Sequence, residues 1–465
     1  MTAASTGRDR YDVALDRLVR YHPDVIAATT TLVEQEPDFA MGHALMAYLS
    51  LTSTDVPDLD GAEESAATLA ALAATDQERA HRDAVTAWLG GDWHGAARRL
   101  DDHLIAQPDD MLALLVGHQL DFFRGDAQNL RDRVGRSLGR IDPAHPLYAF
   151  VRGMYAFGLE ESGHYALAEA HGLAAVDANP DDVWATHAVV HVYEMQGQVD
   201  TGIGFLHERQ ADWTGNNLFT VHNFWHLALF LLEAGRDEDA LAIYDRQIHH
   251  GGSAGVPLEM LDASALLWRL LLDGVPTGDR FAVLADAWAT RTSMAPWYVF
   301  NDLHATMALA GAGRLDDARA VVERLARYVD APHPAHASNV AMTADIGLPA
   351  SRAVVAFVEG RDDDVIAELW PIRATLQRFG GSHAQRDALQ RTLLTAAVRG
   401  GRHDLAAALL SERLAARQTS VYGWGGRAEL ARRRGDDVTA AAAVAAADEH
   451  RQRFAIAAAG LTIPI

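Results

Sequence analysis

The residues best suited to chemistry in this sequence are histidines placed at helical spacing. The chain has 465 residues, of which 22 are His and none is Cys. His187, His191 and Glu194 stand at i, i+4 and i+7, and His222 and His226 repeat the i, i+4 spacing. Side chains at these spacings share one face of an α-helix, where neutral imidazoles and a carboxylate can hold a metal ion or transfer protons. A solvated helix face, or a packed face with hydrogen-bonded imidazoles, is the alternative.

Composition removes several other chemistries. All 40 basic residues are Arg, so the chain contains no Lys, and Cys is also absent. Without Lys or Cys there is no Schiff-base amine, Walker-type phosphate loop, thiolate nucleophile, Fe–S cluster or Cys-type zinc site. We therefore expect no nucleotide, flavin, pyridoxal phosphate or Fe–S cofactor, and a divalent metal is the cofactor that stays open.

The charge balance is acidic. Acidic residues outnumber basic ones 63 to 40, for a net charge of −23. Nucleic acids and anionic membranes attract basic surfaces, and the largest basic cluster along the chain is only Arg432 to Arg434. We expect neither nucleic acid nor a membrane as partner. Residues 1–11 are polar and no apolar run of about 18 residues occurs, which favours a soluble cytoplasmic protein.

The elements that must position the histidines repeat along the chain. Many units have a glycine, an Ala five positions later and a large apolar residue nine positions later, as in Gly91, Ala96 and Leu100. The glycine intervals 91 to 125, 163 to 197 and 401 to 435 are each 34 residues. The marker glycines are Gly91, Gly125, Gly163, Gly197, Gly235, Gly274, Gly313, Gly360, Gly401 and Gly435.

Each unit indicates a helix, a glycine that permits the turn, and a second helix. Such helix pairs bury their apolar faces only by stacking on their neighbours. The period resembles that of tetratricopeptide repeats (TPR). We predict an all-α fold, a TPR-like α-solenoid of about nine or ten antiparallel helix pairs that can curl around a central concave pocket.

The regularity of the repeats suggests four regions. Residues 1–76 lack a clean repeat and are expected to form an N-terminal helical cap. TPR-like repeats carrying the His-rich concave face follow over residues 77–328, and further repeats occupy 351–465. Between them, residues 329–350 contain three prolines and no helical period, so we expect an irregular loop that can serve as a lid.

Counting back from the marker glycines shows which residues share a face. In TPR arrays the first helix of each pair lines the concave side, and this register brings several polar and aromatic residues of neighbouring units to one concavity. They are His187, His191, Glu194, His222, Trp225, His226, Ser264, Trp268, Asp302 and His304.

These residues receive predicted roles. The metal-ligand candidates are His187, His191, His222 and His226. The catalytic candidates are His191, His226, Glu194, Asp302 and His304, in which the two first imidazoles bind metal or carry protons and a carboxylate acts as base or orienting partner. His187, His222, Trp225, Ser264 and Trp268 are predicted to contact the ligand.

Residues 380–387, GGSHAQRD, open a helix after two glycines. One interpretation is an ordinary helix N-terminus capped by Ser382 or Asp387. The other is an anion site, in which backbone N–H groups and Arg386 face a carboxylate or phosphate. Arg386 and Asp387 are therefore ligand-binding candidates.

Several segments resemble the tetratricopeptide repeat protein 38 family between about residues 75 and 435. They are MYAFGLEESGHYALAEAHGLAAVDANPDDVWATHAVVHVYEMQG, VHNFWHLALFLLEAGRDEDALAIYD, FNDLHATMALAGAG and GGSHAQRDALQ. The resemblance implies stacked helical hairpins and no particular reaction. It adds Asn223 and His383 to the ligand-binding candidates.

Two functions remain open from the sequence. In the first, the concave groove binds a small polar or anionic molecule and performs acid–base or metal-assisted chemistry, with hydrolysis as the default reaction. In the second, the array is a non-catalytic adaptor whose groove binds a peptide or protein segment. The density of histidines and the lack of Lys to hold a peptide carboxylate favour the first.

Overall fold

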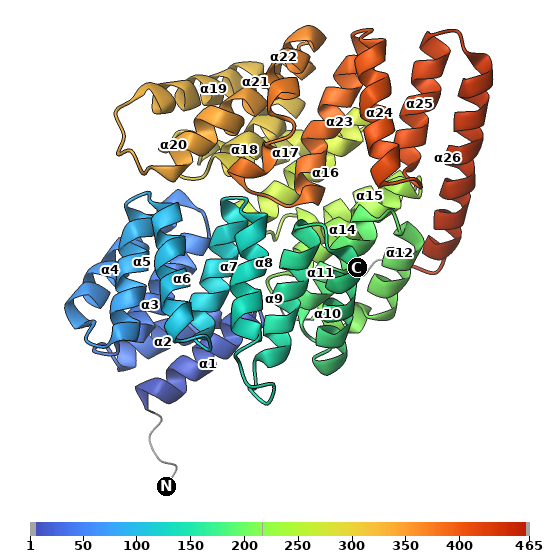
Figure 1. Cartoon of the computed structure of the whole chain (residues 1–465). Helices are drawn as coiled ribbons and strands as arrows, with labels where there is room; N and C mark the ends of the chain where they lie inside the picture. Colours follow the sequence, from blue (N-terminus) through green and yellow to red (C-terminus); the bar gives the residue numbers. More distant parts are fainter. Residues whose placement is uncertain (1–5, 216, 462–465) are drawn as a thin grey trace.

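The computed structural model describes residues 6–215 and 217–461, and its regular structure is helical throughout (Figure 1). No β-strand occurs in these two ranges. The predicted all-α, TPR-like solenoid is confirmed.

The helices of the first part of the chain form antiparallel pairs. They are α1 (Gly7–Val19), α2 (Val25–Gln35), α3 (Ala40–Thr52), α4 (Leu59–Leu72), α5 (Asp76–Leu89), α6 (Trp93–Ala106), α7 (Met111–Phe123), α8 (Ala127–Leu138), α9 (Tyr148–Glu161), α10 (Tyr165–Ala178), α11 (Val183–Met195), α12 (Val199–Glu208) and α13 (Gln210–Trp213). A short 3₁₀ turn, η1 (Val56–Asp58), precedes α4.

The pairs continue to the C-terminal end of the described chain. They are formed by α14 (Thr220–Glu233), α15 (Asp237–Ile243), α16 (Pro257–Leu272), α17 (Arg280–Ala289), α18 (Val299–Gly311), α19 (Leu315–Asp330), α20 (Ser338–Met342), α21 (Leu348–Val358), α22 (Asp362–Ile372), α23 (His383–Arg399), α24 (His403–Ala416), α25 (Val421–Arg433) and α26 (Asp437–Ala458). Two π-helical stretches, η2 (Tyr244–Ile248) and η3 (Thr343–Gly347), and a 3₁₀ turn, η4 (Leu376–Phe379), complete the set.

Local sequence explains where the pairs turn. All ten marker glycines have φ between +64° and +82°, a left-handed conformation that side chains with a Cβ disfavour. An Asp follows Gly91 and Gly125, and each such Asp caps the next helix; Asp92, for example, accepts a hydrogen bond from the Gly95 N–H at 2.7 Å. The glycine therefore ends one helix and the aspartate begins the next.

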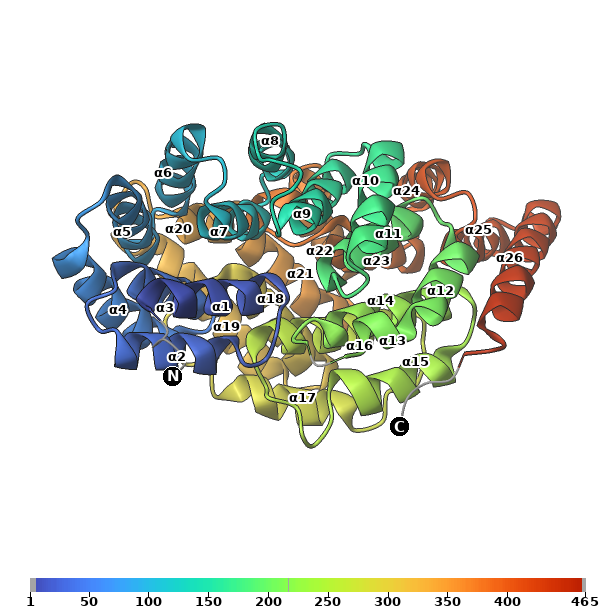
Figure 2. The same ribbon diagram turned by 90° about the horizontal axis from the view of Figure 1, so that it is seen from below.

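The array winds into a superhelix whose second turn lies on the first. In Figure 1 the blue-to-green helices form the lower layer and the yellow-to-red helices the upper one; Figure 2 shows the same molecule from below. The His383 N–H donates to Glu161 at 2.8 Å and the Thr419 hydroxyl donates to the Gly197 carbonyl at 2.5 Å, and both pairs are 222 residues apart. One superhelical turn therefore spans about 222 residues of chain.

The contact between the turns buries the inner face of the array. Every residue of α11 except Met195 is buried, whereas its partner α12 buries four of its residues. The first helix of a pair lies between two layers and the second lies outside. The groove expected along the concave side is consequently filled by side chains over much of its length, which is the physical reason that its histidines are buried.

The irregular loop predicted for residues 329–350 is shorter than expected. Residues 331–337 are irregular, but α20, η3 and α21 form one helical stretch from residue 338 to residue 358. Pro349 fits there because it follows the π-helical stretch η3, in the first turn of α21, where the regular hydrogen-bond ladder of the helix is already interrupted. The Ser338 N–H donates to the Gly91 carbonyl and its hydroxyl accepts from the Trp93 N–H. The segment is an inner helix of its pair and not a lid.

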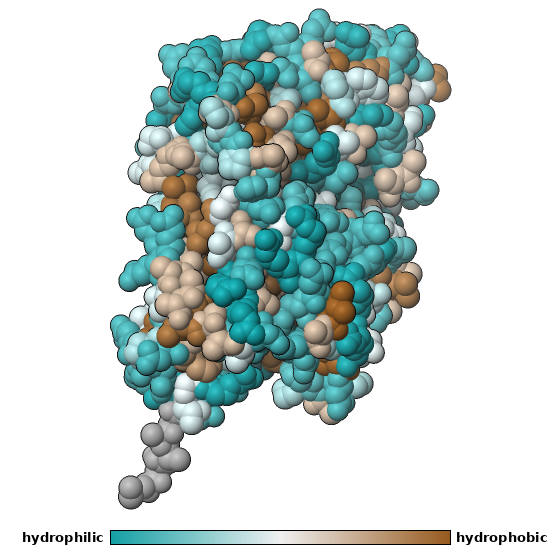
Figure 3. All heavy atoms as spheres, turned by 60° about the vertical axis from the view of Figure 1, so that its left-hand side comes forward, coloured by the Kyte–Doolittle hydropathy of each residue, from teal (hydrophilic) through white to brown (hydrophobic). Residues whose placement is uncertain are grey.

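One helical stretch is long and apolar enough to be compared with a membrane span. Among the described residues, one helical stretch, 338–358, has the length and mean hydropathy of a membrane span, but 67% of its most apolar window is buried inside the fold. A core helix has the same properties. The face drawn in Figure 3 is mainly hydrophilic, with hydrophobic residues in scattered patches.

Candidate metal centre and adjoining cavity

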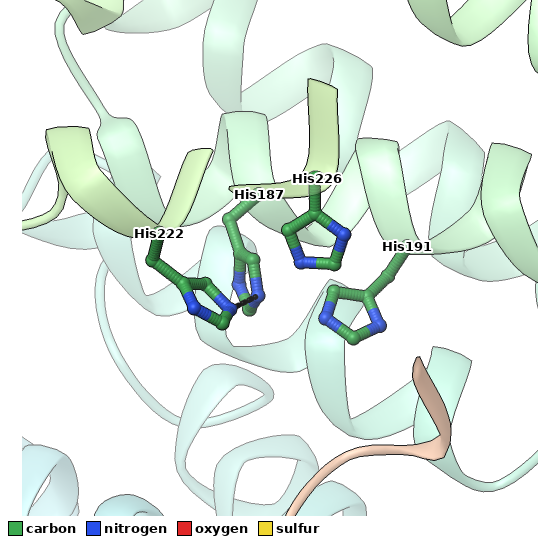
Figure 4. A group of neighbouring side chains, drawn as sticks. All are labelled: His187, His191, His222 and His226. Atoms are coloured by element: carbon green, nitrogen blue, oxygen red, sulfur yellow. Dashed lines mark hydrogen bonds between the residues drawn. The ribbon is translucent and has the colours of Figure 1, made fainter. Parts of the chain in front are cut away.

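Four histidines from two neighbouring first helices meet at one point. His187 and His191 extend from α11, and His222 and His226 extend from α14 (Figure 4). One ring nitrogen from each lies within 4.8 Å of those of the other three, and the Nε2 atoms of His187 and His222 are 3.2 Å apart. We call these four residues the histidine tetrad. The i, i+4 spacing seen in the sequence thus brings the predicted metal ligands together.

Carboxylates accept hydrogen bonds from the outer nitrogens of two of these rings, and a third carboxylate lies near His191 without a hydrogen bond. The Nδ1 atom of His222 lies 2.8 Å from an Asp262 oxygen, and the Nδ1 atom of His226 lies 2.8 Å from a Glu194 oxygen. The Nδ1 atom of His191 is 3.6 Å from Glu160. A carboxylate on Nδ1 fixes the tautomer that carries a lone pair on Nε2 and orients that lone pair, as is usual for metal-ligating histidines.

The environment keeps the imidazoles neutral. Burial lowers the pKa of His187, His191 and His226 well below the usual value, and neighbouring histidines lower it further. These three side chains are at most 2% exposed, and each has at least one ring nitrogen without a hydrogen-bond partner in the described structure. Neutral imidazoles with free lone pairs are the form that binds metal ions.

The spacing fits a metal ion. Zn–N bonds of about 2.0–2.1 Å place the nitrogens of a tetrahedral site roughly 3.3–3.4 Å apart. The 3.2 Å separation of the His187 and His222 nitrogens agrees with that figure. With Asp262 holding the proton on His222 Nδ1, the two Nε2 atoms face each other, so either His187 donates a proton to His222 or both share a cation.

Aromatic rings close one side of the tetrad. Trp225 stacks on His222 with ring centroids 5.2 Å apart and an interplanar angle of 17°, and it meets His226 edge-on at 4.9 Å. Asn223 is fully buried nearby on the same helix, and neither of its side-chain polar atoms has a partner in the described structure. Trp225 is thus a wall of the site, as a packed helix face requires.

A pair of glutamates continues the site toward the second superhelical turn. Glu160 is fully buried and neither carboxylate oxygen has a hydrogen-bond partner among the described residues. Burial, followed by the charges of Glu161 and Glu194, raises the pKa of Glu160 well above its usual value. Glu161 accepts hydrogen bonds from the His383 N–H and from Arg386.

A cavity of about 710 Å³ adjoins the tetrad between the two turns. Glu194 lines it and is also the hydrogen-bond partner of His226. Arg269 lines the cavity as well, and its guanidinium lies 5.3 Å from the Trp225 ring centroid. Further cavity-lining arginines are Arg391, Arg399, Arg413, Arg417, Arg433 and Arg451.

One arginine of the cavity, Arg269, has no ion-pair partner among the described residues, and six carboxylates also line the cavity: Glu194, Glu233, Asp237, Asp273, Asp387 and Glu429. Arg391 binds Asp273, and Arg413 binds Asp387, in ion pairs of 2.7 Å. Arg269 instead donates to the carbonyls of Ala265 and Ala384, and burial lowers its pKa to about 10. At neutral pH this guanidinium is a buried positive charge beside the cavity.

The helix at residues 380–387 has the ordinary capped start, and the anion-site interpretation is wrong for Arg386. Ser382 and Gln385 form a capping box at the beginning of α23. Arg386 is paired with Glu161 at 3.1 Å and donates to the Gly381 carbonyl, so its charge is already balanced by a carboxylate of the protein. Asp387 is held by Arg413, and His383 Nε2 lies 3.0 Å from the Glu161 carbonyl oxygen.

Four further candidates lie outside the cluster of ligand atoms. Asp302 forms an ion pair with Arg324 at 2.5 Å, and the His304 Nδ1–H donates to the Phe300 carbonyl. The Ser264 hydroxyl accepts from Trp288, and the Trp268 indole donates to Thr392. Apart from His304 Nε2, which has no hydrogen-bond partner in the described structure, these polar groups are satisfied locally and join helices. A polar residue at a first-helix position therefore need not face the ligand.

Sequence reasoning missed several residues of the site. Asp262 falls one position outside the concave register used for the first helices, and its apolar neighbours mark it only as an interruption. The register of the first helices does place Glu160 and Glu161 at concave positions, but as adjacent residues they diverge on a helix, poorly placed for glycosidase chemistry, and no role was predicted for them. Arg269 is recognisable as a charge in an apolar helix, and buried charges are usually functional or paired.

Comparisons with known proteins support the fold class. No protein-family model matches the chain. A monomeric IFIT1 mutant with Gppp-AAAA is similar over 95% of this chain and 99% of its own, at 14% identity and a TM-score of 0.38. Yeast Tom70 is similar over 97% of this chain and 95% of its own, at 13% identity and a TM-score of 0.32. Both are TPR-type helical repeat proteins.

The expectation that nucleic acid is not a partner is corrected by the first of these similarities. That IFIT1 mutant was determined with Gppp-AAAA, and the exclusion of nucleic acid is not maintained for this chain. Neither the net charge nor the runs of basic residues along the sequence show which charges the fold brings together. The fold, however, gathers arginines from distant segments around one cavity.

Proposed function

We propose that the protein binds a divalent metal at the histidine tetrad and acts on a small polar or anionic molecule in the adjoining cavity, by metal-assisted hydrolysis. The observation that carries the proposal is the tetrad itself: four converging imidazoles, three of them held neutral by burial, with carboxylates on two of the outer nitrogens and a third carboxylate near His191. Imidazole ligands suit Zn, Cu, Fe and Ni ions.

The tetrad and the cavity have different proposed roles: the tetrad holds the metal, and the cavity holds the substrate. A metal that takes a fifth ligand beside the four imidazoles would supply Lewis-acid chemistry and lower the pKa of a water coordinated there. Glu194 orients His226 and faces the cavity, so it stands between the ligand space and the tetrad. Arg269 offers a positive charge to an anionic group of the substrate. Arg269 thus takes the anion-binding role that the sequence predicted for Arg386.

The alternative, a non-catalytic adaptor that binds a peptide segment, has less support in the geometry. A peptide in a TPR groove needs an open inner face, and here the second superhelical turn covers the first along contacts such as Thr419 to Gly197. A cavity of about 710 Å³ has the size of a small-molecule site.

The first test is elemental analysis of untagged protein as purified, together with a tetrad double variant, His187→Gln with His222→Gln. We expect about one equivalent of Zn, Mn or Fe per chain at the tetrad in the unaltered protein and its loss in the double variant. The matched control is His304→Gln, which changes a buried histidine outside the tetrad and should keep the metal.

Two outcomes contradict the proposal. If the unaltered protein neither contains metal nor binds Zn²⁺ after dialysis, the tetrad is a packed helix face. If the metal persists in the double variant while circular dichroism shows a folded protein, the ion lies elsewhere. With metal at the tetrad, a screen of hydrolysable anionic compounds then tests the reaction, and Arg269→Gln should raise KM for an anionic substrate.

A further inference from the structure

In the buried glutamate pair beside the tetrad, Glu161 is paired with an arginine and Glu160 is not, so Glu160 stays protonated unless a cation binds there. Four carboxylates surround the tetrad: Glu160, Glu161, Glu194 and Asp262. Among the residues that the structure describes, Arg386 is the one arginine within ion-pair distance of any of these four. Carboxylates in a protein interior are paired with cations or coordinate metals, because an isolated buried charge is very costly.

The geometry around Glu160 is that of a ligand set. One ligand atom each from Glu160, Glu161 and His191 lies within 4.8 Å of the other two, and all three residues are buried. Neither oxygen of Glu160 and neither ring nitrogen of His191 has a hydrogen-bond partner in the described structure. Polar atoms this deeply buried are normally satisfied, so four unpartnered atoms side by side point to a missing partner.

His191 connects this group to the tetrad. Its Nδ1 atom lies 3.6 Å from Glu160, while its ring lies 4.5 Å from that of His226 and 4.4 Å from that of His187. The two nitrogens of one imidazole lie on different edges of the ring, so a single side chain can serve two neighbouring sites. If both nitrogens bind metal, the imidazole releases its remaining proton to solvent.

We propose that Glu160, Glu161 and His191 hold a second divalent cation next to the tetrad, which makes the centre dinuclear. The donor set has two carboxylates and one imidazole, harder than the tetrad, and therefore favours Mn²⁺ or Fe²⁺ where the tetrad favours Zn²⁺. The inference rests on the proposed function in one respect, since His191 is shared by both sites. A pair of ions is a common arrangement in enzymes that hydrolyse phosphate esters and amides.

The test uses the different metal preferences. The metal-free full chain is first given one equivalent of Zn²⁺, which fills the higher-affinity tetrad, and is then dialysed against Mn²⁺, after which both metals are measured. We expect about one equivalent of each per chain in the unaltered protein. Glu160→Gln keeps the shape of the side chain but not its charge, and should lower Mn²⁺ affinity at least tenfold while Zn²⁺ is retained.

Two further variants guard against an effect of misfolding. Glu161→Gln changes the other carboxylate and should also lower Mn²⁺ affinity. Glu208→Gln, on the exposed end of α12, is the control and should leave both metals unchanged. Circular dichroism and the unfolding midpoint of each variant establish that it is folded.

The outcomes separate this inference from the proposed function. If Zn²⁺ binds but the unaltered protein takes up no Mn²⁺, or if Glu160→Gln binds Mn²⁺ as tightly as the unaltered protein, the second site is wrong and the tetrad stands. If Zn²⁺ does not bind while Mn²⁺ does so in a Glu160-dependent way, the second site stands and the tetrad is wrong. If neither metal binds, both are wrong.

Discussion

At the scale of single residues, the carboxylates around the tetrad are expected to contribute to metal affinity together with the histidines. Glu194 accepts a hydrogen bond from His226 Nδ1 at 2.8 Å, which leaves Nε2 of that ring as the free nitrogen. Loss of such a partner typically costs 10- to 100-fold in metal affinity, because the ring loses its orientation and part of its basicity. We expect Glu194→Gln to raise the Zn²⁺ dissociation constant by about 10- to 100-fold in a competition titration with a chromogenic chelator.

The control for this prediction is Glu208→Gln, which removes an exposed carboxylate from α12 and should leave the dissociation constant unchanged. Equal Zn²⁺ affinity in Glu194→Gln and the unaltered protein would show that this carboxylate does not tune the tetrad. The thermal unfolding midpoint of the metal-free variant distinguishes a loss of folding from a loss of Zn²⁺ affinity.

The free-energy cost of burying an imidazole outside the tetrad can be measured at His304. Burial lowers its pKa to about 4, although the Phe300 carbonyl favours the protonated form. In the unfolded chain the pKa is about 6.5. Between pH 6.5 and 4 the unfolded state therefore binds a proton that the folded state does not, so stability falls as pH falls.

From this difference we expect His304 to account for about 1.4 kcal/mol of the stability that the metal-free protein loses between pH 7.5 and 5.5. Urea unfolding at the two pH values measures it. The loss should be smaller by that amount in His304→Gln and unchanged in His207→Gln, which alters an exposed histidine of α12. The same loss in both variants would mean that His304 is protonated in the folded protein.

Much of the site's core was predictable from residue spacing, and its surroundings were not. The i, i+4 pairs His187–His191 and His222–His226 are a local property of two helices, and helical geometry alone brings each pair to one face. Asp262 reaches His222 from α16, and its contribution depends on how two helices pack. His304 and Asp302 satisfy the same positional rule as the tetrad but find local partners instead.

At the scale of secondary-structure elements, the capping of α23 joins the two superhelical turns. The Ser382 hydroxyl accepts from the Gln385 N–H at 3.2 Å, and the Gln385 side chain accepts from the Ser382 N–H at 3.0 Å. Ser382 is 1% exposed, so water cannot replace the lost hydrogen bond. We expect Ser382→Ala to lower the free energy of unfolding by about 2 kcal/mol, measured by urea denaturation.

Thr75 provides the matched comparison for that prediction. It forms the same capping box with Glu78 at the start of α5, but on the surface. Water can satisfy the freed N–H there, so Thr75→Ala should cost about 1 kcal/mol or less. Equal losses for the two substitutions would indicate that the burial of the α23 cap contributes nothing.

The positions of glycine and aspartate predict the helix pairs. The positions of proline do not predict where a helix begins or ends. All ten marker glycines end the first helix of a pair, as their spacing predicts. The prolines of residues 329–350 predicted a loop over the whole segment, but Pro349 follows the π-helical stretch η3, where the hydrogen-bond ladder of the helix is already interrupted. Sequence alone does not distinguish a proline that breaks a helix from one that a helix accommodates.

At the scale of the whole molecule, the superhelical turn of about 222 residues explains both the buried tetrad and the cavity. Contacts such as His383 to Glu161 are not encoded in any local pattern, because they depend on the small rotation that each helix pair adds to the last. That accumulated rotation decides which first helices face each other across the interior. The open groove expected from the repeats alone is replaced by an interior between two turns.

The fit between the turns can be tested at Gly125, whose first-turn backbone touches the second turn. A Cβ built on Gly125 would lie 1.5 Å from the Gln377 carbonyl oxygen, and its φ is +64°. Gly313 has a similar φ of +74° and nothing within 4 Å of an added Cβ. Gly313→Ala should therefore cost only the backbone strain, about 1–2 kcal/mol in the free energy of unfolding.

Gly125→Ala adds to the same strain a clash between the two turns, for which overpacked interiors typically lose a further ~1–3 kcal/mol. Urea unfolding of the two variants measures the difference, which isolates the contact between the turns because the backbone strain cancels. If the turns are pressed together as the Gly125 contact requires, Gly125→Ala should also weaken Zn²⁺ binding, since the second turn holds Glu161 through His383 and Arg386 beside the tetrad. Equal unfolding free energies for the two variants would instead mean that the second turn moves away from the first without cost, and the tetrad would then be open to solvent.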